Sequence, residues 1–209
     1  HPLTVPLADM KAAGRRAGGK LNDAFVAAIA SGWRRYHDHH GEPASALRMS
    51  MPINVRTAAT ENVAGNQFAP ARFPVPLTVI DPVHRMKVVR DLVGRARAEP
   101  ALALTEPLAN VLNRLHPDVT TGIFGSMLRG VDFVTSNVPG PPFPIYLAGA
   151  RVVSQFPFGP MAGAAANVTL LSYVDDLNIG INTDPAAVPD PDVLLESFQE
   201  GFDEVLKTA

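Results

Sequence analysis

Three histidines in a short stretch are the first residues that could do chemistry. His37, His39 and His40 could ligate a metal, and the first and last of them would share one helix face. A structural zinc site needs four ligands, however, and the nearby acids do not complete a set. Asp38 would point to another face and Glu42 lies past the helix end. Because cationic side chains are favoured at a helix C-terminus without any metal, we expect no metal site here.

The acidic pair Asp175-Asp176 could act as a general acid and base. It falls between two extended apolar segments, where aspartate is favoured in turns, so we interpret it as a hairpin turn. The chain has no cysteine, which excludes disulfides, thiolate zinc sites and cysteine nucleophiles. It also lacks a Gly-x-Ser-x-Gly elbow, a P-loop and a Gly-x-Gly-x-x-Gly motif. The residues alone therefore present no complete catalytic set.

A rigid turn is predicted at Asn137-Val138-Pro139-Gly140-Pro141, where an apolar extended run breaks abruptly. Proline removes a backbone donor and fixes φ, and glycine permits a positive φ. An asparagine at the end of a buried strand, followed by residues whose backbone dihedral angles are restricted, fits either a chain reversal or a loop that faces a ligand. The residues themselves leave both interpretations open.

Composition narrows the classes of partner. Charged residues make up 18% of the 209 residues, below the ~25% typical of soluble domains, which indicates extensive burial or an apolar partner surface. The formal net charge is −2 and there is no Lys/Arg block, so nucleic acid is not expected as the main partner. No run approaches the ~18 apolar residues of a membrane-spanning helix, and the first residues show no signal-peptide pattern.

Three long helices are predicted to position these residues. Asn22 is expected as the N-cap of the first, with Asp23 at the positive end of its dipole. An Asp-Pro pair at 81–82 and another at 190–191 predict the starts of the other two, and a shorter helix is expected over 108–115. Apolar spacing assigns their buried faces to Phe25, Ile29, Trp33 and Tyr36, to Met86, Val89, Val93 and Ala96, and to Leu194, Phe198, Phe202 and Val205.

Strands are predicted between these helices. Alternation over 47–55 indicates a half-buried strand, in which Pro52 suggests an edge or a bulge. Residues 58–76 are interpreted as a loop that runs into a second extended segment. Further extended segments are expected over 131–136 and 151–156, and a hairpin at 168–173 and 177–182. Helices and strands mix without strict alternation, so we expect an α/β (mixed α+β) fold with an open mixed sheet covered by helices. The Pro/Gly-rich residues 1–20 are interpreted as a linker or processed segment that precedes a domain over 21–209.

Four stretches, in order, resemble the C-terminal domain of the bacterial wax ester synthase/acyl-CoA:diacylglycerol acyltransferase family. They are KLNDAFVAAIASGWRRY, LRMSMPINVRTAATENVAGNQ, TSNVPGPPFPIYLAGARV and NVTLLSYVDDLNIGINTDPAAVPDPDVLLESF. The resemblance runs from about Val5 to the end, and its most characteristic motifs are Asn22-Asp23 and Asn137–Pro141. It implies the chloramphenicol acetyltransferase-like fold of the CoA-dependent acyltransferases, in which two similar halves enclose a tunnel.

The family's catalytic motif, His-His-x-x-x-Asp-Gly, is absent from this chain. His39-His40 is followed by Gly-Glu-Pro-Ala-Ser, so the resemblance implies that the catalytic base lies in an N-terminal half outside this sequence. Asn137–Pro141 would then stand at the interface of the halves and shape the acyl or CoA channel, while Asn22 and Asp23 would be structural. The family often carries a glycine two residues after a Ser-Tyr pair, and its absence after Ser172-Tyr173 predicts a different local turn.

The resemblance implies transfer of a fatty acyl group from acyl-CoA to diacylglycerol or a long-chain alcohol, giving triacylglycerol or a wax ester. Acyl-CoA would be a substrate, and no cofactor is expected. The implied partners are the N-terminal half and a membrane or lipid-droplet surface facing the bacterial cytoplasm. Two alternatives remain: a non-catalytic lipid-binding or docking domain of the same fold, and a superfamily acyltransferase with a different acceptor.

Overall fold

A six-stranded mixed sheet forms the centre of the molecule. The computed structural model describes residues 1–54, 68–99, 130–161 and 163–209. In sheet order the strands are β1 (Pro2–Pro6), β8 (Asp176–Thr183), β7 (Ala166–Tyr173), β4 (Phe133–Val138), β2 (Ala46–Asn54) and β3 (Phe68–Pro76). The β2–β4 and β4–β7 pairs are parallel and the other three pairs are antiparallel. The predicted mixed sheet is therefore confirmed.

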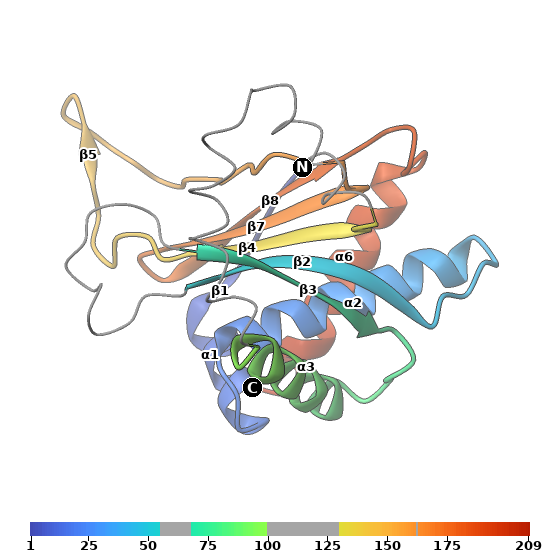
Figure 1. The fold of residues 1–209 in the computed structure, drawn as a ribbon. Coiled ribbons are helices and arrows are strands. Elements are labelled where there is room, and N and C mark those ends of the chain that lie inside the picture. The colour runs from blue at the N-terminus through green and yellow to red at the C-terminus, as the bar shows by residue number, and fades with distance from the viewer. Residues whose placement is uncertain (55–67, 100–129, 162) are drawn as a thin grey trace, which may run out of the picture.

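The described helices all lie on one face of this sheet (Figure 1). They are α1 (Leu7–Arg16), α2 (Leu21–His39), α3 (Pro82–Arg97) and α6 (Pro191–Leu206). The opposite face carries no helix among the described elements (Figure 1). A second sheet of two short strands, β5 (Tyr146–Leu147) and β6 (Ala150–Arg151), lies in the connection between β4 and β7. None of the helices in the described ranges has the length and apolarity needed to cross a membrane.

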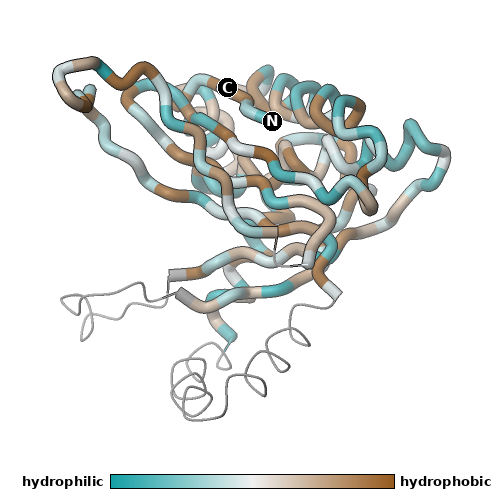
Figure 2. Tube along the Cα trace, turned by 90° about the horizontal axis from the view of Figure 1, so that it is seen from above, coloured by the Kyte–Doolittle hydropathy of each residue, from teal (hydrophilic) through white to brown (hydrophobic). Residues whose placement is uncertain are grey.

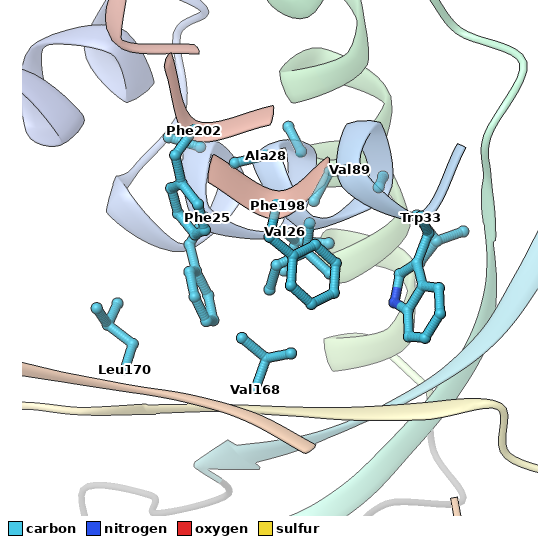
Figure 3. Packing of buried hydrophobic residues seen from close by; sticks show 14 of the residues in the cluster. Phe25, Val26, Ala28, Trp33, Val89, Val168, Leu170, Phe198 and Phe202 are labelled. Carbon is cyan, nitrogen blue, oxygen red and sulfur yellow. The ribbon is translucent and has the colours of Figure 1, made fainter. Parts of the chain in front are cut away.

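The core lies between the sheet and the helices. Figure 3 shows aromatic side chains of α2 and α6 packed above Val168 and Leu170 of β7. The Phe25 and Phe202 ring centroids are 6.1 Å apart, and those of Trp33 and Phe198 are 5.5 Å apart. Full burial of one such side chain contributes about 1.5–3 kcal/mol to folding. The buried faces predicted for the three helices are confirmed, with Ala96 only partly buried.

The N-terminal segment is structured, which corrects the interpretation of 1–20 as a linker. β1 pairs along its whole length with β8, and its Leu3 and Val5 are buried. Met10 of α1 is fully buried as well. The prolines that suggested a linker lie at the ends of an edge strand, where proline is tolerated. The partner that makes these residues a strand lies at least 170 residues away in sequence, so no local pattern could reveal it.

The helix starts agree with the sequence only in part. Lys20, not Asn22, is the N-cap of α2, and its backbone N–H donates to Asp23 Oδ2 at 2.7 Å. Asp81 caps α3 as predicted, because its carboxylate accepts the His84 N–H at 2.9 Å. α6 begins at Pro191 as predicted, but the side chain of Asp190 makes no capping hydrogen bond.

The strand predicted over 47–55 is confirmed as β2 over the described residues, and the extended segment expected at the end of 58–76 is β3. β4 and the β7–β8 hairpin are confirmed too. Pro52 does not lie on an edge strand. β2 is an inner strand, but its pairing with β4 is limited to Met49 and Ser50, so Pro52 lies beyond it. The strand expected over 151–156 is wrong beyond Arg151, since 152–161 has no regular structure. The helix expected over 108–115 falls outside the described residues.

Candidate functional site

A groove of about 540 Å³ lies on the sheet face opposite the helices. Its walls come from β2, β3, β4 and β7 and from the irregular segment 157–160. None of its lining residues is charged, and most of them are apolar. A volume of this size is typical of pockets for small molecules.

Strand alternation explains how β4 contributes to the groove. Phe133 faces the helices, with its ring centroid 5.9 Å from that of Trp33. Successive side chains of a strand point to opposite faces, so Val134, Ser136 and Val138 face the groove. Because the β2–β4 pairing stops at Ser50 and Val134, the described ends of the two strands beyond it border the groove.

The segment 157–160 is held against the sheet by two asparagines. Asn167 Nδ2 of β7 donates to the Pro160 carbonyl at 2.8 Å, and Asn182 Nδ2 of β8 donates to the Gly159 carbonyl at 2.8 Å. Thr169 Oγ1 donates to Asn167 Oδ1 at 2.6 Å, which fixes the orientation of that amide. One wall of the groove is therefore an irregular segment that side-chain hydrogen bonds fix to the sheet. Sequence reasoning missed it, and the only signal was the polar residues at alternate positions of β7 and β8.

The predicted turn Asn137–Pro141 leaves the end of β4 beside the groove. Val138 lines the groove and is partly exposed, and Asn137 is exposed. The Gly140 N–H donates to Ser172 Oγ at 3.1 Å, and the Pro141 carbonyl accepts the Val174 N–H at 3.2 Å. The turn is thus bound to the end of the β7–β8 hairpin, where Val174 adopts a positive φ of 54°.

Beyond this turn the chain projects from the body as the β5–β6 hairpin, as Figures 1 and 2 show from two directions. Its exposed apolar side chains include Phe143, Tyr146 and Leu147, followed by Val153. Arg151 is the one charged residue in the whole sequence between Phe133 and Val174. The base of the hairpin is fixed, since Tyr173 Oη donates to the Val152 carbonyl at 2.8 Å. Apart from Arg151, its exposed side chains form an uncharged surface away from the core.

Asn22 and Asp23 lie at the start of α2, on the helix side of the sheet, so the structure does not bring them together with the Asn137–Pro141 turn. Asn22 Nδ2 lies 3.4 Å from Met51 Sδ. Asp23 is buried, and burial raises the pKa of its carboxyl even though the Lys20 N–H and nearby arginines act in the opposite direction. These contacts fit the structural role that the sequence suggested for the pair.

The other polar candidates have local partners. His37 Nδ1 lies 3.1 Å from the Glu42 carbonyl oxygen, His40 Nε2 lies 3.7 Å from Asp190 Oδ2, and His39 is exposed. Within the described ranges, no three His, Asp or Glu side chains gather as a metal site would require. Asp175 lies in the tight turn between β7 and β8.

Comparisons with known proteins agree with this architecture. The family model described as "WS/DGAT C-terminal domain" matches residues 64–206. The chain is 38% identical over 207 residues to the "Putative diacyglycerol O-acyltransferase Rv2484c" of Mycobacterium tuberculosis, covering 99% of this chain and 42% of that protein. It is 30% identical over 203 residues to the "Probable diacyglycerol O-acyltransferase tgs1" of the same species, covering 94% of this chain and 44% of that protein. The chain thus spans less than half the length of these relatives.

Solved structures give the same fold. The wax ester synthase/diacylglycerol acyltransferase from Marinobacter aquaeolei VT8 superposes with a TM-score of 0.71 at 23% identity, covering 98% of this chain and 47% of that one. The first condensation domain of the CDA synthetase superposes with a TM-score of 0.56 at 14% identity, covering 100% of this chain and 45% of that one. The matched family model covers more than half of the chain. The chain therefore belongs to the wax ester synthase/diacylglycerol acyltransferase family and matches its C-terminal domain.

Proposed function

We propose that this chain is the C-terminal half of an acyl-CoA-dependent O-acyltransferase that makes triacylglycerol, wax esters or both. The observation that supports this most directly is the uncharged groove on the helix-free face of the sheet. A fatty alkyl chain has no polar group to satisfy, so an uncharged and largely apolar groove favours its binding. The names of the mycobacterial relatives support the same substrate class.

The reaction is an acyl transfer from a thioester to a hydroxyl group. A histidine of the N-terminal half takes the proton of the acceptor hydroxyl, whose oxygen attacks the thioester carbonyl. The tetrahedral oxyanion then collapses and the CoA thiolate leaves with a proton. In this scheme the present half contributes no catalytic residue. It binds alkyl substrate along the groove, excludes water from it and forms one side of the interface between the halves.

The exposed hairpin supports the proposal of an interface. Large apolar side chains that project from the body cost free energy unless a partner covers them. We assign this role to the N-terminal half, because the relatives are more than twice as long as this chain. The turn Asn137–Pro141 borders the groove and leads directly into the hairpin, which supports an interface next to the groove. Peripheral association with a membrane or lipid droplet, facing the cytoplasm, would bring the whole enzyme to its acceptors.

The test compares the whole protein with the 209-residue chain. Each is incubated with palmitoyl-CoA and either diacylglycerol or hexadecanol, and the released CoA and the lipid products are measured. We expect turnover by the whole protein and none by the 209-residue chain, which lacks the His-His-x-x-x-Asp-Gly motif. Robust turnover by the chain alone would contradict the division of roles. A whole protein that binds lipid without turnover would favour a non-catalytic docking domain.

A further inference from the structure

We propose that Phe158 is a specificity-determining residue, a fixed wall that sets which alkyl chains the groove accepts. The inference rests on the proposed function and names the residue that selects among its substrates. Phe158 lines the groove and leaves 54% of its surface exposed. It is the one aromatic side chain among the described lining residues, so it is the largest obstacle that a bound chain meets.

Phe158 rests on bare backbone of the sheet. A Cβ atom added to Gly180 of β8 would lie 1.8 Å from the Pro157 carbonyl oxygen and 3.0 Å from Phe158 Cδ1. The segment therefore approaches β8 at the one position of that strand that has no side chain. The ring has the strand directly beneath it and cannot retreat in that direction.

The same segment is anchored at the two residues that follow Phe158. Asn182 binds the Gly159 carbonyl and Asn167 binds the Pro160 carbonyl, both at 2.8 Å. Asn167 is itself buried, so its hydrogen bonds are shielded from competing water. Pro157 and Pro160 stiffen the chain further because their φ angles are fixed. A wall that cannot move discriminates by shape, whereas a mobile one would adapt to each substrate.

The chemistry of the groove matches an alkyl chain. Its polar groups near Phe158 are already partnered, since Thr169 donates to Asn167 and Asn167 donates to a backbone carbonyl. The chain could belong to the acyl donor or to the acceptor, because both carry the same kind of tail. In an apolar pocket, one methylene changes kcat/KM by about 10-fold or more, so a methyl branch at the wall should have a measurable effect.

The experiment uses the whole enzyme and two series of substrates. The donor series compares palmitoyl-CoA with phytanoyl-CoA at fixed hexadecanol, and the acceptor series compares hexadecanol with phytol at fixed palmitoyl-CoA. We expect Phe158→Ala to raise the branched-to-straight ratio of kcat/KM by about 10-fold in one series. Phe158→Trp should lower the same ratio. The series that responds identifies which substrate lies in the groove.

Two further variants distinguish substrate selection by the Phe158 wall from a general defect of the enzyme. Ile80 is 69% exposed and precedes α3, outside the groove, so Ile80→Ala should leave both ratios unchanged. Asn182→Ala removes one anchor and should shift the responding ratio in the direction of Phe158→Ala by a smaller factor. An active enzyme whose ratios are the same in wild type, Phe158→Ala and Phe158→Trp would overturn the assignment of Phe158 alone. A wild-type enzyme without acyl transfer would overturn the proposed function itself.

Discussion

Gly140 is the residue of the Asn137–Pro141 turn with the tightest surroundings. A Cβ atom there would lie 2.0 Å from the Ser172 carbonyl oxygen. The sequence suggested that a positive φ could explain this glycine, but Gly140 is not among the residues with positive φ. The reason for glycine is therefore close approach to another strand, which no local pattern reveals.

Gly140→Val should destabilise the 209-residue chain by about 1–3 kcal/mol, the usual cost of forcing atoms into a packed site. Urea unfolding measures this directly. Gly94→Ala is the matched control, because the added Cβ of this α3 residue meets nothing within 4 Å. That variant should gain up to about 1 kcal/mol from the higher helix propensity of alanine. Equal stability of Gly140→Val and wild type would contradict the packing that we describe.

Asn137 should behave differently from Gly140, since its side chain is exposed at the end of β4. Asn137→Ala should change the unfolding free energy of the 209-residue chain by no more than about 1 kcal/mol. In the whole protein we expect acyl transfer to fall markedly, because the interface or channel loses a polar anchor. Unfolding of the chain and turnover of the whole protein are measured side by side. Full turnover by the variant would leave the asparagine as part of a simple chain reversal.

At the scale of elements, the helices α2, α3 and α6 are joined by a buried ion pair. Arg85 of α3 is 1% exposed, and its Nη2 lies 3.2 Å from Glu204 Oε2 of α6. Glu204 also accepts a hydrogen bond of 2.5 Å from Ser31 of α2. Burial alone would raise the pKa of Glu204, but Ser31 and Arg85 together hold it below its ordinary value. The folded state therefore favours the ionised carboxylate.

Glu204→Gln should cost about 3 kcal/mol at pH 7, at the low end for breaking a buried pair because Glu204 is partly exposed. A carboxyl whose pKa is lowered by folding adds stability above its unfolded pKa and loses it as the pH falls through the folded pKa. The difference between wild type and variant should therefore shrink on acidification below about 4.5, the ordinary value for glutamate. Urea unfolding at several pH values measures this difference.

Glu200 of the same helix provides the comparison for this measurement. Glu200 Oε2 lies 2.8 Å from Arg35 Nη1, but the Glu200 side chain is well exposed. Exposed pairs contribute about 0–1 kcal/mol, so Glu200→Gln should have a small effect. If the two variants lose the same stability, Arg85 and Glu204 do not form the buried connection among the helices.

Helices were easier to predict from this sequence than edge strands. The faces of α2 and α6 repeat every three or four residues, and burial on one side of a helix imposes that period. β1 has only five residues, of which the first and last are prolines, and it is stabilised by β8 from the other end of the chain. The residues after Arg151 have the composition of a strand but no regular structure, and asparagines of the sheet bind the carbonyls of Gly159 and Pro160 further along this segment. Long-range partners thus decided the cases in which local patterns failed.

At the scale of the whole molecule, the groove could not be predicted because it has no sequence motif of its own. Its residues come from four strands and a loop, and each of them is an ordinary apolar or small polar residue. The family resemblance indicated a tunnel between halves, and the Asn137–Pro141 turn indicated one of its borders. Phe158, Asn167 and Asn182 became visible only when β7, β8 and the segment 157–160 were placed together.

The hairpin allows a test of how the halves associate. Tyr146 and Leu147 of β5 are 67% and 75% exposed, so replacing both by serine should change the unfolding free energy of the 209-residue chain by no more than about 0.5 kcal/mol. If the hairpin packs against the N-terminal half, the same double variant should lower turnover of the whole protein. It should also speed hydrogen–deuterium exchange at 142–153.

Ile80→Ser serves as the control, because Ile80 is equally exposed but lies outside the hairpin. An effect of the double variant on the 209-residue chain alone would show that the hairpin stabilises its own domain. Identical turnover and exchange in the double variant and Ile80→Ser would mean that the hairpin does not contact the N-terminal half.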